Sequence, residues 1–161
     1  MRPGAPPHFP RFPLYILRCQ FMDIPSKTPG IEHTTLLDPL DVPARLEELK
    51  ALRNGWLNGR GIAPAPAGLD WLSREIKTRY PEAVPSPYIY PVAEGGVRLE
   101  WSITPQEVSL EIDLSQKSGE WHALNLHTDV DESRTLNLDD VAAWDWMIRR
   151  LSEIVGAMSR D

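Results

Sequence analysis

The chain has 161 residues, of which 42% are hydrophobic and 25% charged, a composition typical of an ordinary globular domain. Its formal net charge is −6, and because contacts to phosphates need lysine and arginine, an acidic chain argues against general nucleic-acid binding. A single cysteine, Cys19, excludes an internal disulfide, and no apolar run approaches the roughly 20 residues that span a bilayer. We therefore expect a cytoplasmic protein without a membrane segment.

Residues 1–40 are predicted to form a mostly irregular, proline-rich head ahead of a single domain over residues 41–161. Five of the first 21 residues are proline, a density that neither a helix nor a strand tolerates. The same stretch holds three arginines and no acid, so the rest of the chain carries a net charge of −9. Three interpretations of the head stay open: an unstructured terminus, a tail that docks a partner as polyproline II, or a natural translation start at Met22.

Two helices are expected next in the chain. The first should cover residues 42–54, with Asp41 as its N-cap and Gly55 ending it in a left-handed conformation. The second should cover residues 68–79 and stop before Pro81. The apolar residues that recur in it at helical spacing are Leu69, Leu72 and Ile76.

The segment between these helices, residues 55–61, holds three glycines and should form a tight, shaped loop. It lacks the strand-before, helix-after context and the Gly-Lys-Ser/Thr ending of a phosphate-binding loop, which excludes a nucleotide site. We expect Trp56 to pack the loop onto the core. The candidate ligand-binding residues around this loop are Trp56, Gly59, Gly61, Tyr88 and Tyr90.

After Pro81 the hydrophobic period changes from 3.6 to 2, which predicts strands. A short strand flanked by prolines, 87–92, should lie at an edge of the sheet. Strands over 97–103, 107–114 and 121–128 should follow, the last with Leu124 and Leu126 facing inward. The alternation predicts an antiparallel meander with one apolar and one acidic face.

The last helix begins near Asn137, which can cap it, and Asp139 and Asp140 lie at the positive end of its dipole. Its apolar stripe should lie on the apolar face of the sheet. We therefore predict an α+β fold: a three- to four-stranded antiparallel meander with two N-terminal helices and one long C-terminal helix packed on one face. The stripe consists of Val141, Trp144, Met147, Ile148, Leu151, Ile154, Val155 and Met158.

Trp146 lies about 150° from the centre of this stripe, on the polar side of the helix. Tryptophan and arginine are enriched in binding hot spots, so this side of the helix is a candidate partner-binding surface. The alternatives are that Trp146 packs under the loop over 129–135 or stacks on Arg150. The candidate partner-binding residues are Trp146, Arg149, Arg150 and Glu153.

The sequence offers little for catalysis. His122 and His127 are five residues apart on a predicted strand and should point to opposite faces, and no metal-ligand spacing of the Cys/His type occurs. We expect no catalytic residue, metal or cofactor and favour a non-enzymatic protein. The alternative is a metal-assisted hydrolase that uses Glu100, Glu111 and a histidine, against the simpler interpretation of a solvated acidic face.

Three motifs in order resemble a widespread group of small uncharacterised bacterial proteins: the loop 55–61 with Pro64, the segment 87–91, and the segment 94–101. Those proteins have a Trp–Gly–Gly–Pro loop, a Pro-x-Ile-x-Pro strand and a Gly-Gly-Val/Ile-x-Leu-Glu-Trp strand. The resemblance covers residues 42–128 and implies a bacterial origin, with Trp56 and Trp101 as shared scaffold residues. Where the group often has an aspartate beside the loop tryptophan, this chain has Leu57 and Asn58.

From these features we expect a non-catalytic interaction or accessory module, antitoxin-like or self-associating, that binds a basic protein or a second copy of itself. The acidic body, the off-stripe Trp146 and the lack of a catalytic constellation motivate this expectation. A metal-assisted hydrolase and a small-molecule binder at the glycine-rich loop stay open as alternatives.

Overall fold

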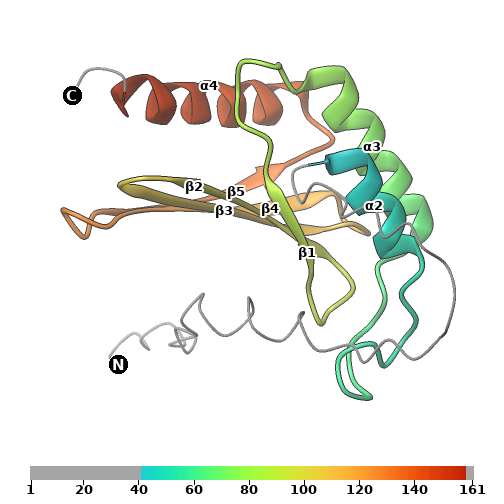
Figure 1. The fold of residues 1–161 in the computed structure, drawn as a ribbon. Helices are drawn as coiled ribbons and strands as arrows, with labels where there is room; N and C mark the ends of the chain where they lie inside the picture. Colours follow the sequence, from blue (N-terminus) through green and yellow to red (C-terminus); the bar gives the residue numbers. More distant parts are fainter. Residues whose placement is uncertain (1–40, 159–161) are drawn as a thin grey trace, which may run out of the picture. The chain divides into compact units, whose positions relative to one another are not determined.

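The computed structural model describes residues 41–158, so the predicted head, with Cys19 and Met22, lies outside the described residues. Helix α4 (Val141–Met158) lies across one face of an antiparallel sheet, and helices α2 (Val42–Lys50) and α3 (Pro66–Arg79) stand at one end of it (Figure 1). None of the helices in this part of the chain is long and apolar enough to cross a membrane. The elements are α2 (Val42–Lys50), α3 (Pro66–Arg79), β1 (Tyr88–Pro91), β2 (Val97–Ile103), β3 (Gln106–Asp113), β4 (Ser118–Asn125), β5 (Asp131–Asn137) and α4 (Val141–Met158).

Both N-terminal helices form with shifted ends. The Asp41 carboxylate accepts a hydrogen bond from the Ala44 N–H at 3.1 Å, which confirms the predicted N-cap. Helix α2 ends at Lys50, four residues earlier than expected, where the guanidinium of Arg53 donates to the carbonyls of the last turn. Helix α3 begins at Pro66 rather than residue 68, because proline suits the first turn of a helix.

The sheet has five strands in the order β1-β2-β3-β4-β5, every neighbouring pair antiparallel. The prediction of a meander and of an edge position for β1 is confirmed. The prediction of three to four strands is wrong, because β5 occupies a segment that we expected to be a loop. Only Leu136 is buried in this strand, so its sequence lacks the apolar alternation that marks the others.

Strand β4 differs from expectation in its bounds and in its inward residues. It runs from Ser118 to Asn125 rather than over 121–128, and Trp121 and Ala123 face the core. Leu124 lies on the opposite face, and Leu126 is 49% exposed in the turn after the strand. Side chains alternate between the two faces of a strand, so Trp121 and Leu124 cannot both face the core. The larger Trp121 takes the inward position and thereby fixes the register.

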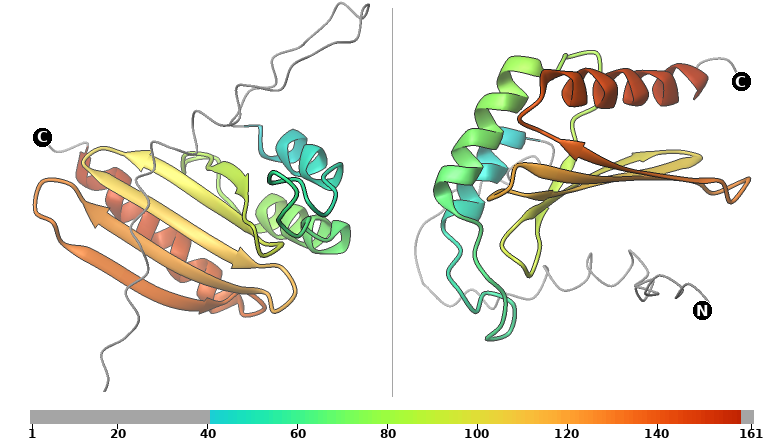
Figure 2. Two further views of the ribbon diagram at one scale, coloured as in Figure 1. Left: turned by 90° about the horizontal axis from the view of Figure 1, so that it is seen from below. Right: turned by 180° about the vertical axis from the view of Figure 1, so that it is seen from behind.

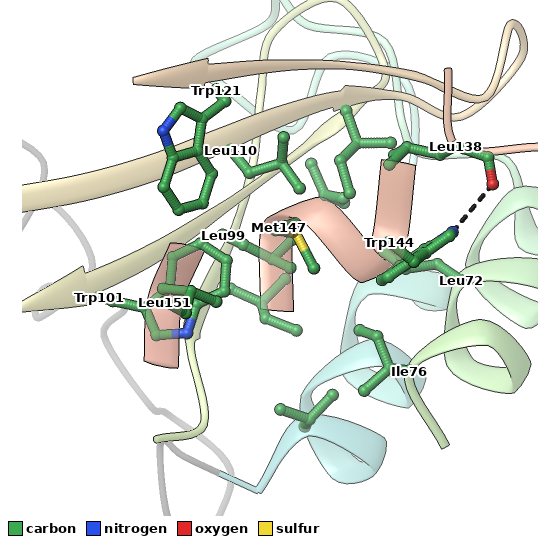
Figure 3. Close-up of a cluster of buried hydrophobic side chains, with 14 of the residues drawn as sticks. Leu72, Ile76, Leu99, Trp101, Leu110, Trp121, Leu138, Trp144, Met147 and Leu151 are labelled. Carbon is green, nitrogen blue, oxygen red and sulfur yellow. Dashed lines mark hydrogen bonds between the residues drawn. The ribbon is translucent and has the colours of Figure 1, made fainter. Parts of the chain in front are cut away.

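The core lies between α4 and one face of the sheet, and it extends to α3, which contributes Leu72 and Ile76 (Figure 3). Trp144 is buried and donates its indole N–H to the Leu138 carbonyl at 2.9 Å, which fixes the start of α4. The Asp140 carboxylate caps the helix by accepting from the Ala142 N–H, where we had expected Asn137 to act as the cap. Met147 and Leu151 follow at helical spacing and are fully buried, as the stripe predicts.

Candidate functional site

One face of the sheet is covered by α4, and the opposite face, here called the outer face, is not covered by any helix of the described residues (Figure 1; Figure 2). Strand register places its side chains in rows. One row runs across all five strands, and it consists of Tyr88, Glu100, Ser109, His122 and Ser133. A second row consists of Tyr90, Arg98, Glu111, Glu120 and Thr135, and a third of Ser102, Glu107, Leu124 and Asp131.

The outer face is acidic. Among the described residues it holds six carboxylates and one arginine, which is already paired: Arg98 Nη2 lies 2.5 Å from Glu111 Oε2. The remaining acids have few cationic neighbours, which leaves this surface with a negative potential. These carboxylates belong to Glu100, Glu107, Glu111, Asp113, Glu120 and Asp131.

Glu100 is more shielded than Glu111: their side chains are 20% and 41% exposed. Burial raises the pKa of Glu100, an effect that Arg98 opposes and Glu107 strengthens. Arg98 Nη1 is 4.0 Å from the Glu100 carboxylate, and a partly desolvated carboxylate with so distant a partner is stabilised further by a cation brought closer to it. The centre of the outer face is therefore suited to receive a positive group.

The glycine-rich loop lies on the outer-face side of the sheet, next to the β1–β2 hairpin (Figure 1). Asn58 and Gly59 both have positive φ angles, 50° and 82°, and Leu57 and Arg60 exchange backbone hydrogen bonds of 2.9 Å around them. This is the geometry of a two-residue Asn-Gly turn. The Ile62 N–H donates to the Ala93 carbonyl at 2.8 Å, which holds the loop against the sheet.

The predicted ligand-binding residues occupy two neighbouring places. Tyr88 and Tyr90 are half-buried on the outer face of β1, beside Glu100 and Arg98 respectively. Trp56 is half-buried, and its indole N–H donates to the Ile62 carbonyl at 3.1 Å. A β-carbon at Gly61 would lie 3.0 Å from this indole nitrogen, so the ring closes over the loop backbone. The indole N–H of Trp56 thus holds the loop together, and this is the polar group that a ligand would otherwise contact.

Two of the predicted partner-binding residues, Trp146 and Arg150, contact β5. Trp146 is half-buried: its ring meets that of Trp121 edge to face at 5.5 Å, and the guanidinium of Arg134 lies 4.4 Å from its centroid. It therefore stacks on Arg134 of β5 and not on Arg150. Arg150 binds the Glu132 carboxylate, with Nη2 at 2.7 Å. Glu153 pairs with Arg150 at 3.1 Å, and Arg149 is exposed.

The histidines and acids of the hydrolase hypothesis are spread apart. His122 lies on the outer face, whereas His127 lies beyond the end of β4 in the following turn, so the two do not share a strand. Glu111 is engaged by Arg98. Within residues 41–158, no three His, Cys, Asp or Glu side chains are grouped closely enough to hold a metal ion. That hypothesis gains no support from the structure.

Sequence reasoning missed one surface, the edge of β5 with which no other strand of residues 41–158 pairs. The strand carries Glu132 and Arg134 on the face toward α4. Apolar residues at these positions would have produced the alternation that predicts a core strand. A weak signal was present: Leu136 and Leu138 share the even positions with Glu132 and Arg134.

Comparisons with known proteins give no assignment. No family model matches the chain, and no match is found among the curated proteins or among the solved structures. The resemblance to a bacterial group, drawn from short motifs, stays a prediction.

Proposed function

We propose that the protein is a non-catalytic interaction module whose outer face binds a basic protein partner. The observation that carries the proposal is a five-stranded sheet with one face under α4 and the other lined with carboxylates. Residues 41–158 contain 19 acidic and 12 basic side chains, so the surroundings reinforce the negative potential. Such a field accelerates and orients encounters with a cationic protein.

The arrangement of side chains supports contact with an extended segment. Glu107 and Glu120 stand on neighbouring strands of the outer face, and neither forms an ion pair within the described residues. Lysine or arginine side chains of a partner could pair with both. Tyr88 at one margin offers an aromatic ring, which attracts guanidinium and ammonium groups through its face.

Charge reversal on the outer face tests the proposal. The probe is a synthetic extended peptide of alternating arginine and tyrosine residues, titrated by calorimetry at low ionic strength. We expect the double variant Glu107→Lys with Glu120→Lys to bind at least about tenfold more weakly than the wild type, a loss near 1.4 kcal/mol. Its matched control is Glu82→Lys with Asp145→Lys, which changes net charge equally at exposed positions away from the outer face.

The control should bind within about threefold of the wild type, since distant exposed charges are screened. Equal losses of affinity in both double variants would mean that peptide binding depends only on the net charge of the protein. That result, or the absence of binding by the wild type, would overturn the proposal.

A further inference from the structure

Strand β5 has a free edge with usable backbone groups. Figure 2 shows α2 and α3 beside the β1 edge, whereas β5 lies at the other edge of the sheet. Asn125 N–H donates to the Val130 carbonyl at 2.9 Å and Leu138 N–H to the Lys117 carbonyl at 2.8 Å, so even-numbered residues of this strand bond to β4. The N–H and C=O groups of Asp131, Ser133 and Thr135 therefore point away from the sheet. Among the described residues, nothing pairs with them.

We propose that a second copy of this chain pairs with that edge, β5 to β5, antiparallel and centred on Ser133. The two sheets then form one continuous sheet with α4 of both copies on the same side. An isologous pairing of this kind uses the same surface twice and closes on itself, which ends the growth that a free edge otherwise permits.

Charge selects the register. On the free edge, odd-numbered residues must face odd-numbered residues, which limits the symmetric choices. Centring on Ser133 places Glu132 opposite Arg134 of the second copy, twice by symmetry. Shifting the centre by one residue places Glu132 opposite Glu132 or Arg134 opposite Arg134, and like charges directly opposite each other are destabilising. The Ser133-centred register alone makes the strand complementary to itself.

The same register covers an exposed apolar side chain. Val130 is 64% exposed and immediately precedes β5. In the Ser133-centred pairing it lies opposite Leu136 of the second copy, on the side facing α4. An open hollow lies there, between β5 and the start of α4, and its lining combines Leu136, Ala142 and Ala143 with the polar residues Arg134, Thr135, Asn137 and Asp140. Val130 would fill this hollow, an apolar contact that the charge argument does not require.

The pairing goes beyond the proposed function and does not depend on it. It would place two acidic outer faces side by side on one surface, so that a basic partner with two binding segments could engage both at once. Loss of the dimer should weaken such bivalent binding while leaving the affinity of a single outer face unchanged.

Substitutions of Ser133 by proline and by alanine separate the contribution of its backbone N–H from that of its side chain. Ser133→Pro removes the edge-facing N–H and leaves the β4 ladder intact, since proline is tolerated on edge strands. Ser133→Ala retains the N–H. Measured by light scattering after size exclusion at protein concentrations up to about 1 mM, wild type and Ser133→Ala should be dimers and Ser133→Pro a folded monomer by circular dichroism. A monomeric wild type, or a dimeric Ser133→Pro, would overturn the proposal.

A cross-link tests the register even if the proline variant fails to fold. In a Cys19→Ser background, Ser133→Cys places two cysteines at the symmetry axis, within the distance that a disulfide spans. Mild oxidation should give a covalent dimer for Ser133→Cys and none for Thr135→Cys, whose partner position is Asp131. Efficient cross-linking of Thr135→Cys without Ser133→Cys would refute the Ser133-centred pairing.

Discussion

Trp101 donates its indole N–H to the hydroxyl oxygen of Tyr80 at 2.8 Å, and both side chains also donate to the Pro85 carbonyl. Tyr80 follows α3 directly, and Trp101 lies on the inner face of β2. The three groups therefore tie the end of α3 and the segment before β1 to the centre of the sheet. Burial raises the pKa of Tyr80, as expected for a hydroxyl held away from water.

Removal of the Tyr80 hydroxyl should destabilise the fold. Tyr80→Phe leaves the ring in place but deletes one donor to Pro85 and one acceptor for Trp101. We expect the free energy of unfolding in urea to fall by about 1–2 kcal/mol. The control is Tyr88→Phe on the outer face, for which a change below about 0.5 kcal/mol is expected. Equal losses for the two variants would show that the Tyr80 network contributes nothing specific.

Glu100 should make stability depend on pH. Because burial raises the folded-state pKa of Glu100 above the ordinary value of a glutamate, the ionised carboxylate disfavours folding, and the penalty grows as pH rises through that ordinary value. Glu100→Gln should therefore stabilise the protein at pH 7 and have no effect well below pH 4.5. Thermal unfolding across this range measures the difference, with the exposed Asp145→Asn as control. A stabilisation that persists at low pH would contradict the assigned cause.

The glycine-rich loop can be tested with two matched substitutions. Gly59 and Gly61 both have φ near +80°, so alanine is strained at either position by about 1 kcal/mol. A β-carbon at Gly59 meets nothing within 4 Å, whereas one at Gly61 meets the Trp56 ring at 3.0 Å. Gly61→Ala should therefore reduce the free energy of unfolding more than Gly59→Ala. Equal effects would indicate that Trp56 does not pack on the loop.

The parts of the fold that could be predicted are those in which burial imposes a period on the sequence. Strands β2 and β3 alternate strictly between buried and outward residues, and α4 carries a broad apolar stripe. The fifth strand could not be found because an edge strand that buries only Leu136 has no such period. The end of β4 was missed because Asn125 turns the chain with its own side chain, accepting the N–H groups of His127 and Thr128.

The candidate site was predictable in character but not in extent. Alternation alone identified the outer face as acidic, with Glu100 and Glu111 on it. The position of Trp146 could not be inferred from a helical wheel, because it depends on Trp121 and Arg134, which reach it from two strands. Such long-range packing is a property of the tertiary structure and leaves no mark within one helix.

The most direct measurement of the central claim is an amide chemical-shift map of the protein titrated with the arginine–tyrosine peptide. Binding at the outer face predicts shifts concentrated in the centre of β2, β3 and β4 around Glu100, Ser109 and His122, with helix α4 unchanged. The shifts should vanish in the Glu107→Lys, Glu120→Lys variant and persist in its control. Shifts concentrated on α4, or spread evenly over the surface, would contradict the outer face as the binding site.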